Sequence, residues 1–231
     1  MKRLGIIGGL GPETSCKFTL NVNNKFKQLA GRQPDILLHN LPISAEAEQK
    51  MIRGESTSEH LKLLLEAVQV MNEAQVDCIV IPCNTVHVFL PELRRRSHAL
   101  ILSIVEECAR ECERKKFRKV GLLASKTTVK SRLHSRELRK QGIELLTPDD
   151  VDQAQVNSII LNILNGKAEA KDKQRLLTII NELGSRGADG IILGCTDLPL
   201  LITEKDTSVP LINTCELLEN AAVDTINATR E

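Results

Sequence analysis

The sequence predicts an α/β fold made of two similar halves, each a mostly parallel sheet flanked by helices. Three observations lead to this prediction. Short apolar runs alternate with amphipathic helical patterns along the whole chain, as they do in βαβ units. A motif of an Asp, a short apolar run and a Cys occurs twice, at residues 77–83 and 189–195. A basic pair that leads into an apolar run and small residues also occurs twice, at residues 2–9 and 118–125.

The expected elements follow from these patterns in chain order. Short continuous apolar runs predict buried strands, and apolar positions three and four apart predict helices. Strands are expected at residues 3–8, 35–39, 77–82, 99–103, 119–124, 143–146, 189–194 and 209–212. Helices are expected at residues 13–29, 57–74, 88–96, 104–115, 128–141, 150–165, 171–186 and 214–228.

Two cysteines, Cys83 and Cys195, stand at the ends of predicted buried strands. In both copies of the motif the Cys follows the Asp by six positions. Open α/β sheets bind their ligands at the carboxyl ends of the strands. The matched positions therefore predict a site in a cleft between the halves, to which each half contributes one thiol.

Likeness between two βαβ units is weak support for a duplication by itself, since any two such units look alike. The shared register of the two cysteines makes duplication the better interpretation. No low-complexity linker separates the halves, and the boundary is expected near residues 97–99.

Composition limits the partners of the chain. It has 231 residues and a formal net charge of +1, so no basic surplus attracts nucleic acid. It lacks Trp and Tyr, which also argues against base-stacking platforms. No apolar run approaches the roughly 20 residues that span a membrane, and the glycines near the start favour a strand over a signal peptide. Seven scattered cysteines suit a reducing cytoplasm.

The two thiols are candidates for acid/base catalysis. A free Cys has a pKa of about 8.5, which falls at a helix N-terminus, and Asn84-Thr85 and Thr196-Asp197 could each open a helix. Backbone N–H groups there could bind a carboxylate. Two thiols on opposite sides of a substrate suit proton transfer at carbon, one as thiolate and the other as thiol. The alternative is that each Cys is a small buried apolar residue.

The other cysteines are assigned to packing. Cys16, Cys78 and Cys215 fall within or at the start of predicted elements, and Cys108 and Cys112 share one helix face. No cysteine pair or histidine stands beside them at zinc-site spacing. We therefore expect no metal.

Two further features leave alternatives open. His87 follows the first Cys motif, where it either lowers the pKa of Cys83 or has a structural role at a helix start. The Gly-rich segment 8–14 matches neither the dinucleotide fingerprint nor the P-loop. It is either a loop that closes over a small ligand or a plain tight turn.

Several motifs together resemble the aspartate/glutamate racemase family, which is independent of pyridoxal phosphate. They are Gly8–Pro12, Pro82–His87, Gly121–Ser125 with Thr128–Ser131, and Gly194–Leu200. The resemblance covers essentially the whole chain and implies two pseudo-symmetric α/β domains with the active site between them, commonly in a homodimer. It also places the C-terminal helix with the first domain, so that the domains are 1–98 plus 213–231 and 99–212.

The resemblance implies roles for residues that match the family's motifs by position. Cys83 and Cys195 are the catalytic acid/bases, and no cofactor is needed. The residues implied to bind the carboxylate and ammonium groups of an amino acid are Asn84, Thr85, Ser125, Thr128 and Thr196. Lys167 matches the region where family members have a substrate-binding Lys. Asp197 is implied to contact the substrate's ammonium.

Two departures from the family pattern concern the substrate. Asp197 stands where aspartate racemases usually have a Glu, so its carboxylate is one methylene shorter. The segment 42–48 lacks the Arg that pairs with a side-chain carboxylate, and Lys50 and Arg53 are the nearest cations. A neutral residue does not replace a bidentate Arg without cost. We expect the segment 44–53 and Asp197 to set substrate choice.

The sequence thus predicts a cofactor-independent amino-acid racemase that uses two cysteines and acts on aspartate or another small acidic amino acid. One alternative is a carboxylate isomerase or decarboxylase of the same superfamily. Another is an amino-acid-binding protein without turnover.

Overall fold

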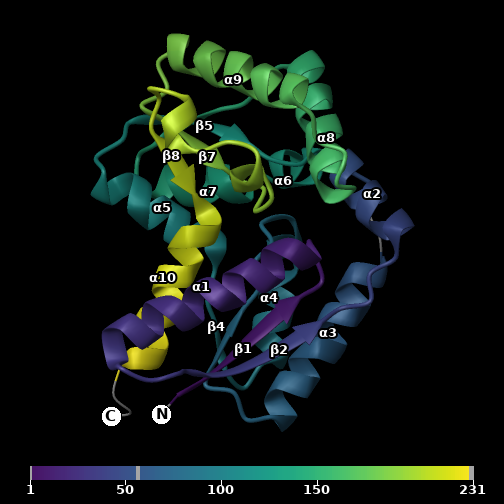
Figure 1. The fold of residues 1–231 in the computed structure, drawn as a ribbon. Coiled ribbons are helices and arrows are strands. Elements are labelled where there is room, and N and C mark those ends of the chain that lie inside the picture. Colours follow the sequence, from purple (N-terminus) through teal and green to yellow (C-terminus); the bar gives the residue numbers. More distant parts are fainter. Residues whose placement is uncertain (1, 56–57, 229–231) are drawn as a thin grey trace.

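Two parallel sheets form the framework of the computed structural model, which describes residues 2–55 and 58–228 (Figure 1). The first sheet has the order β2 (Asp35–Asn40), β1 (Arg3–Gly8), β3 (Cys78–Val80), β4 (Leu100–Ile101). The second has the order β6 (Glu144–Leu146), β5 (Lys119–Leu123), β7 (Gly190–Leu193), β8 (Leu211–Asn213). Neighbouring strands are parallel throughout. Both halves have the same strand order, and the predicted fold class is confirmed.

Helices flank both sheets. In the first half they are α1 (Pro12–Ala30), α2 (Ala45–Arg53), α3 (Ser58–Glu73) and α4 (Leu90–Arg96), with the 3-10 turn η1 (Thr85–Phe89) before α4. The following helices are α5 (Ile104–Arg114), α6 (Lys126–Ser131), α7 (Leu133–Lys140), α8 (Asp150–Leu164) and α9 (Ala170–Ser185). The 3-10 turns η2 (Leu198–Leu200) and η3 (Glu204–Asp206) precede the last helix, α10 (Thr214–Asn227).

The Asp of each repeated motif has the same structural role in its half. Asp77 Oδ2 accepts a hydrogen bond of 2.6 Å from the backbone N–H of Arg3, at the start of β1. Asp189 Oδ2 accepts hydrogen bonds from the N–H groups of Arg118 and Lys119, of 2.7 and 3.0 Å, at the start of β5. The repeated Asp therefore fixes the strand that carries the Cys beside the first strand of its sheet.

Helix α10 packs against the first half, although it follows the last strand of the second (Figure 1). Leu218, Ala222 and Ile226 share a buried cluster with Phe18 and Val22 of α1. The same cluster includes Ile104 and Val105 of α5, from the other predicted domain, so the assignment of α10 to the first domain stays a prediction. The division into 1–98 plus 213–231 and 99–212 stays a prediction.

Strand β4 lies beyond the boundary expected near residues 97–99. It pairs with β3 through Cys78–Leu100 and Ile79–Ile101, so the first sheet continues past residue 98. An apolar run predicts a strand but does not identify the neighbour with which it pairs. The sequence therefore could not assign this strand to either half.

Helix α2 was not expected, although it has clear end signals. Ser44 Oγ accepts a 3.2 Å hydrogen bond from the N–H of Ala47 at the start, and Gly54 ends the helix at φ 90°. The buried residues of this short helix are Ala47, Met51 and Ile52. The helix has only nine residues, fewer than the roughly 11 or more over which helical periodicity is recognised in a sequence.

The helix expected at 128–141 is two helices, α6 and α7. They meet at Arg132, whose φ of 57° is left-handed and breaks the helical path. The start expected at residue 57 lies outside the described residues, and α3 is described from Ser58 onward. No helix in the described ranges is long and apolar enough to cross a membrane.

Candidate active site

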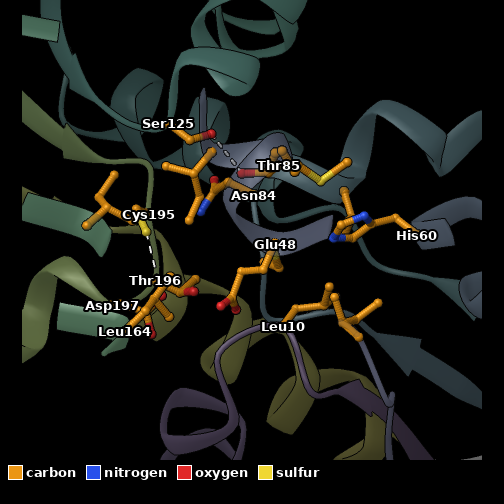
Figure 2. A pocket seen from close by; sticks show the side chains of 16 residues that line it. Leu10, Glu48, His60, Asn84, Thr85, Ser125, Leu164, Cys195, Thr196 and Asp197 are labelled. Carbon is orange, nitrogen blue, oxygen red and sulfur yellow. Dashed lines mark hydrogen bonds between the residues drawn. The ribbon is translucent and has the colours of Figure 1, made fainter. Parts of the chain in front are cut away.

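A pocket lies where the carboxyl ends of β3 and β7 face each other across the two halves (Figure 2). Its volume, including the part open to solvent, is about 490 Å³, within the range of small-molecule sites. Its polar lining residues are Glu48, His60, Cys83, Asn84, Thr85, Ser125, Cys195, Thr196 and Asp197. Its apolar lining residues are Leu10, Ile43, Met51, Ile52, Val86, Ile160 and Leu164.

Most of the residues proposed from sequence therefore lie together, and two do not line the pocket. Thr128 lies directly behind Ser125, with the two hydroxyl oxygens 3.0 Å apart. Lys167 follows the end of α8 as an exposed residue and is absent from the described lining. Lys50 and Arg53, on α2, are also exposed and absent from it.

Several hydrogen bonds join the loops of the two halves around the pocket. Thr85 Oγ1 lies 3.0 Å from both Ser125 Oγ and Thr128 Oγ1. Thr196 Oγ1 donates a 3.1 Å hydrogen bond to the carbonyl of Pro82. Asn84 Nδ2 donates to Thr214 Oγ1 at 2.9 Å, and Thr214 in turn donates to the carbonyl of Leu193 on β7 at 2.8 Å. These bonds hold the two Cys loops in a fixed relation to each other.

Both cysteines are partly buried at the pocket, and their surroundings favour the protonated thiol. The pKa of Cys83 is raised to about 11, mainly by burial and also by the charges of Asp197 and Glu48. The N–H groups of Val86 and Thr85 donate to the sulfur and oppose this rise. Burial likewise raises the pKa of Cys195 well above its ordinary value, with Asp197 the next cause. A cation brought into this pocket would favour the thiolates.

His87 holds the Cys83 loop as a neutral imidazole. Its Nε2 accepts a 3.2 Å hydrogen bond from the N–H of Ile104, so Nδ1–H donates to the carbonyl of Cys83 at 2.7 Å. Burial lowers the pKa of His87 to about 4. Of the two roles considered from sequence, the structural one fits this geometry, because a neutral ring supplies no charge to lower the pKa of Cys83.

Asp197 is almost fully buried and is engaged through both of its oxygens. Thr14 Oγ1 donates to Oδ1, and the Cys195 thiol donates to Oδ2 at 3.6 Å. Burial raises the pKa of this carboxyl. Gly11 lies against it with φ 106°, and a Cβ there would come within 2.9 Å of Oδ1. The Gly-rich segment therefore lies directly against the Asp197 side chain, and Gly11 leaves the space that this carboxylate occupies.

Helix α2 adds a second carboxylate that sequence reasoning missed. Glu48 points into the pocket toward the side where Thr196 and Asp197 lie (Figure 2). Burial raises its pKa, and the charge of Asp197 adds to the rise. The Ser44 cap followed by acidic residues and Gly54 was the available sign of a helix here. His60 of α3 and Thr14 of α1 were also missed.

The lining has no obvious place for a metal or a Schiff-base cofactor. In the described chain no group of three or more His, Cys, Asp or Glu is placed to hold a metal ion. Lysine is absent from the described lining residues as well. What the site offers is two thiols, two carboxylates, hydroxyls and backbone N–H groups, which together suit proton transfer on a zwitterion.

A two-lobed α/β protein with one thiol from each lobe at a shared pocket is the class that this geometry defines. Residues 7–222 match the Asp/Glu/Hydantoin racemase family. The broad specificity amino-acid racemase RacX of Bacillus subtilis (strain 168) is 27% identical over 227 residues, which cover 96% of this chain and 97% of that protein.

Solved structures agree with this match. A candidate Asp/Glu racemase from Yersinia pestis has a TM-score of 0.86 and 29% identity, and the match covers 99% of this chain and 100% of that one. Picrophilus torridus aspartate racemase has a TM-score of 0.83 and 23% identity, with 100% and 96% covered, a likeness of fold. The chain belongs to the Asp/Glu/Hydantoin racemase family. The resemblance noted from sequence and the prediction of a racemase-type enzyme are confirmed.

Proposed function

We propose that this protein racemises amino acids with Cys83 and Cys195 as its two acid/base groups. The observation that best supports the proposal is that both thiols line one pocket, one from each half. The charge of Cys83 also raises the pKa of Cys195. Groups that affect each other's ionisation in this way lie close together, as two bases on opposite faces of one carbon require.

In the proposed reaction one cysteine, as thiolate, removes the proton from the α-carbon. The other, as thiol, donates a proton to the opposite face, which inverts the centre. An amino acid brings its ammonium into the pocket, and this positive charge favours the thiolate that the free pocket disfavours. The N–H groups of Thr85 and Val86 stabilise the Cys83 thiolate in the same direction.

The substrate's α-carboxylate is proposed to bind at the hydroxyls of Thr85 and Ser125, with Thr128 behind them. Its ammonium is proposed to lie near Asp197. Asn84 and Thr196 already donate to protein groups, so their part is to hold the two Cys loops in place. Lys167 is exposed and is absent from the described lining, so its contact with the substrate stays a prediction from sequence.

Other expectations stay predictions. Aspartate or another small acidic amino acid remains the substrate expected from sequence, but no Lys or Arg of the described lining is available for its second carboxylate. A homodimer and a cytoplasmic location are proposed as well. The seven unpaired thiols suit a reducing compartment.

The test follows each enantiomer by chiral chromatography and by uptake of deuterium at the α-carbon in D₂O. Cys83→Ala and Cys195→Ala are each expected to abolish racemisation, while deuterium uptake from one enantiomer can persist at the remaining thiol. Cys16→Ala, which removes an exposed thiol, is the matched control and should retain the wild-type rate.

Racemisation at the wild-type rate in Cys83→Ala or Cys195→Ala would contradict the two-base mechanism. Release of CO₂ without inversion would instead identify a decarboxylase. Tight binding of amino acids with neither exchange nor inversion would identify a binding protein. The wild type should be unaffected by chelation and should show no absorbance of a pyridoxal Schiff base.

A further inference from the structure

The charges inside the pocket do not suit an acidic substrate. Glu48 and Asp197 both line it, and the described lining includes neither Lys nor Arg. His60 is buried, and burial lowers its pKa, which favours the neutral ring. A zwitterionic amino acid adds no net charge, and an acidic one adds a third negative charge. Like charges brought together in a partly buried site repel strongly.

The two carboxylates differ in how they are already engaged. Asp197 accepts from Thr14 through one oxygen and from Cys195 through the other. The Glu48 carboxylate receives no hydrogen bond or ion pair from any residue within 2–55 or 58–228. Glu48 is half-buried, and burial is the main cause that raises the pKa of its carboxyl. Its charged form is therefore partly desolvated before any ligand binds. A half-buried carboxylate without a donor is a binding group for a cation.

The surroundings of Glu48 suit a substrate with a long apolar stem. Ile43, Met51 and Ile52 line the pocket around it, all from the segment that contains or precedes α2, and Leu10 lines it from the β1–α1 loop. Ile160 and Leu164 contribute from α8 of the other half. Such walls bury methylene groups while a charged end reaches a polar partner, as lysine side chains do in proteins.

From these observations we propose that Glu48 binds the side chain of the substrate and that the pocket takes an amino acid with a cationic side chain, of the lysine or ornithine type. The proposal rests on the proposed racemase function and names the substrate class of that same site. The α-ammonium remains near Asp197, and the distal ammonium pairs with Glu48. Bound in this way, the two ammonium groups of the substrate face the two carboxylates of the site, and the substrate adds one net positive charge.

Helix α2 is held in a position that makes this contact possible. Thr127 Oγ1, at the start of α6, donates to the carbonyl of Met51. Ile52 belongs to the buried cluster of the second half, together with Ile160 and Leu123. The helix is therefore fixed to both halves, and Glu48 does not depend on loop closure to face the pocket.

The first experiment compares kcat/KM for lysine, norleucine and glutamate. Norleucine has the same carbon stem as lysine without the cation, and glutamate carries the opposite charge. The wild type is expected to prefer lysine over both. Glu48→Gln should lower the ratio of kcat/KM for lysine to kcat/KM for norleucine by roughly 10- to 100-fold, the range for a charge-assisted contact. A change in the pKa of Cys83 affects both substrates and therefore cancels in this ratio.

The control is Glu46→Gln on the same helix. Glu46 is exposed and pairs with Lys50 at 2.5 Å, so its loss should leave the preference for lysine intact. An equal loss for lysine and norleucine in Glu48→Gln would overturn the proposal and assign Glu48 to the α-ammonium or to structure. A wild type that prefers glutamate would overturn it as well.

A binding measurement separates this proposal from the proposed function. Calorimetric titration of Cys83→Ala with lysine, norleucine and glutamate does not require turnover. Lysine should bind most tightly, and adding Glu48→Gln should remove that advantage. If lysine is preferred but no variant or wild type inverts any amino acid, the racemase proposal fails and the assignment of Glu48 stands. If glutamate binds more tightly, the assignment of Glu48 fails.

Discussion

The hydroxyl of Thr85 lies 3.0 Å from that of Ser125, so the loop after β3 touches the start of α6 in the other half. Thr128 Oγ1 lies 3.0 Å from each of them. Each hydroxyl has one proton to donate, and three mutual contacts use all three. A substrate carboxylate that binds here must therefore redirect at least one of these protons from a hydroxyl to itself.

Thr85→Val tests this ring with a side chain of nearly the same shape. Two contacts between the halves are lost, and we expect the free energy of unfolding to fall by about 1–2 kcal/mol. The KM should rise, because a donor for the substrate carboxylate is removed, while kcat changes less. Steady-state kinetics and urea unfolding measure the two effects.

The control for this variant is Thr178→Val. Thr178 is exposed on α9, and its hydroxyl donates only to a carbonyl of its own helix, at 3.2 Å. Its replacement should leave KM unchanged. If Thr85→Val also leaves KM unchanged, the carboxylate binds elsewhere in the pocket.

The ionisation of Cys83 provides a second prediction. The charge of Glu48 raises the pKa of this thiol, after the larger contribution of burial and that of Asp197. Glu48→Gln should therefore lower the pKa and move the pH profile of Cys83 alkylation to lower pH. Mass spectrometry after timed treatment with iodoacetamide measures this, with the exposed Cys16 as the internal reference. An unchanged profile would mean that Glu48 carries no charge near the thiol.

The strands were the part of the fold most readily predicted from sequence. In β1 and β5 a continuous run without charged residues follows a basic residue, and the matched Asp and Cys positions identified the repeat. The pairing between strands was harder to predict, as β4 shows, because the partner of a strand depends on tertiary packing. Helix α2 was missed because its two acidic first-turn residues and few apolar positions resemble a polar loop.

The site could be predicted where it follows strands and not where it depends on α2. Cys83 and Cys195 were found because they end equivalent strands, and the residues beside them came into the pocket with them. Glu48 and His60 come from helices whose orientation the sequence does not fix. Lys167 was chosen by position in a motif, and its backbone placement after α8 carries it into solvent.

A third prediction concerns His87 as a positioning residue for Cys83. His87→Leu removes the donor to the carbonyl of Cys83 and leaves that buried carbonyl without its partner. We expect kcat to fall by about tenfold or more and the free energy of unfolding to fall by about 1–3 kcal/mol. His87→Asn, whose amide can donate to the same carbonyl, should restore part of kcat. If both variants lose stability equally but retain kcat, His87 serves the fold alone.

The last prediction concerns His134, a buried residue of α7 whose two ring nitrogens have no hydrogen-bond partner in the described structure. Its pKa is lowered to about 3, mainly by burial and in part by the neighbouring His87. An imidazole in the unfolded chain has a pKa near 6.5. Between about pH 6.5 and 3 the unfolded state therefore binds more protons than the folded one, so stability falls as pH falls through this window.

His134→Leu should accordingly stabilise the fold at neutral pH, by about 1 kcal/mol, because an unpaired polar ring is replaced by an apolar side chain. Below about pH 6.5 it should also reduce the slope of the free energy of unfolding against pH, by up to about 1.4 kcal/mol per pH unit. Urea unfolding at a series of pH values between 4 and 8 measures both effects, and His98→Leu at an exposed position is the control. His87, whose pKa burial lowers to about 4, should keep part of the acid dependence in the variant. The substitution is expected neither to open a cavity nor to break a hydrogen bond. A His134→Leu protein that is less stable at neutral pH would therefore show that the imidazole ring makes a stabilising contact.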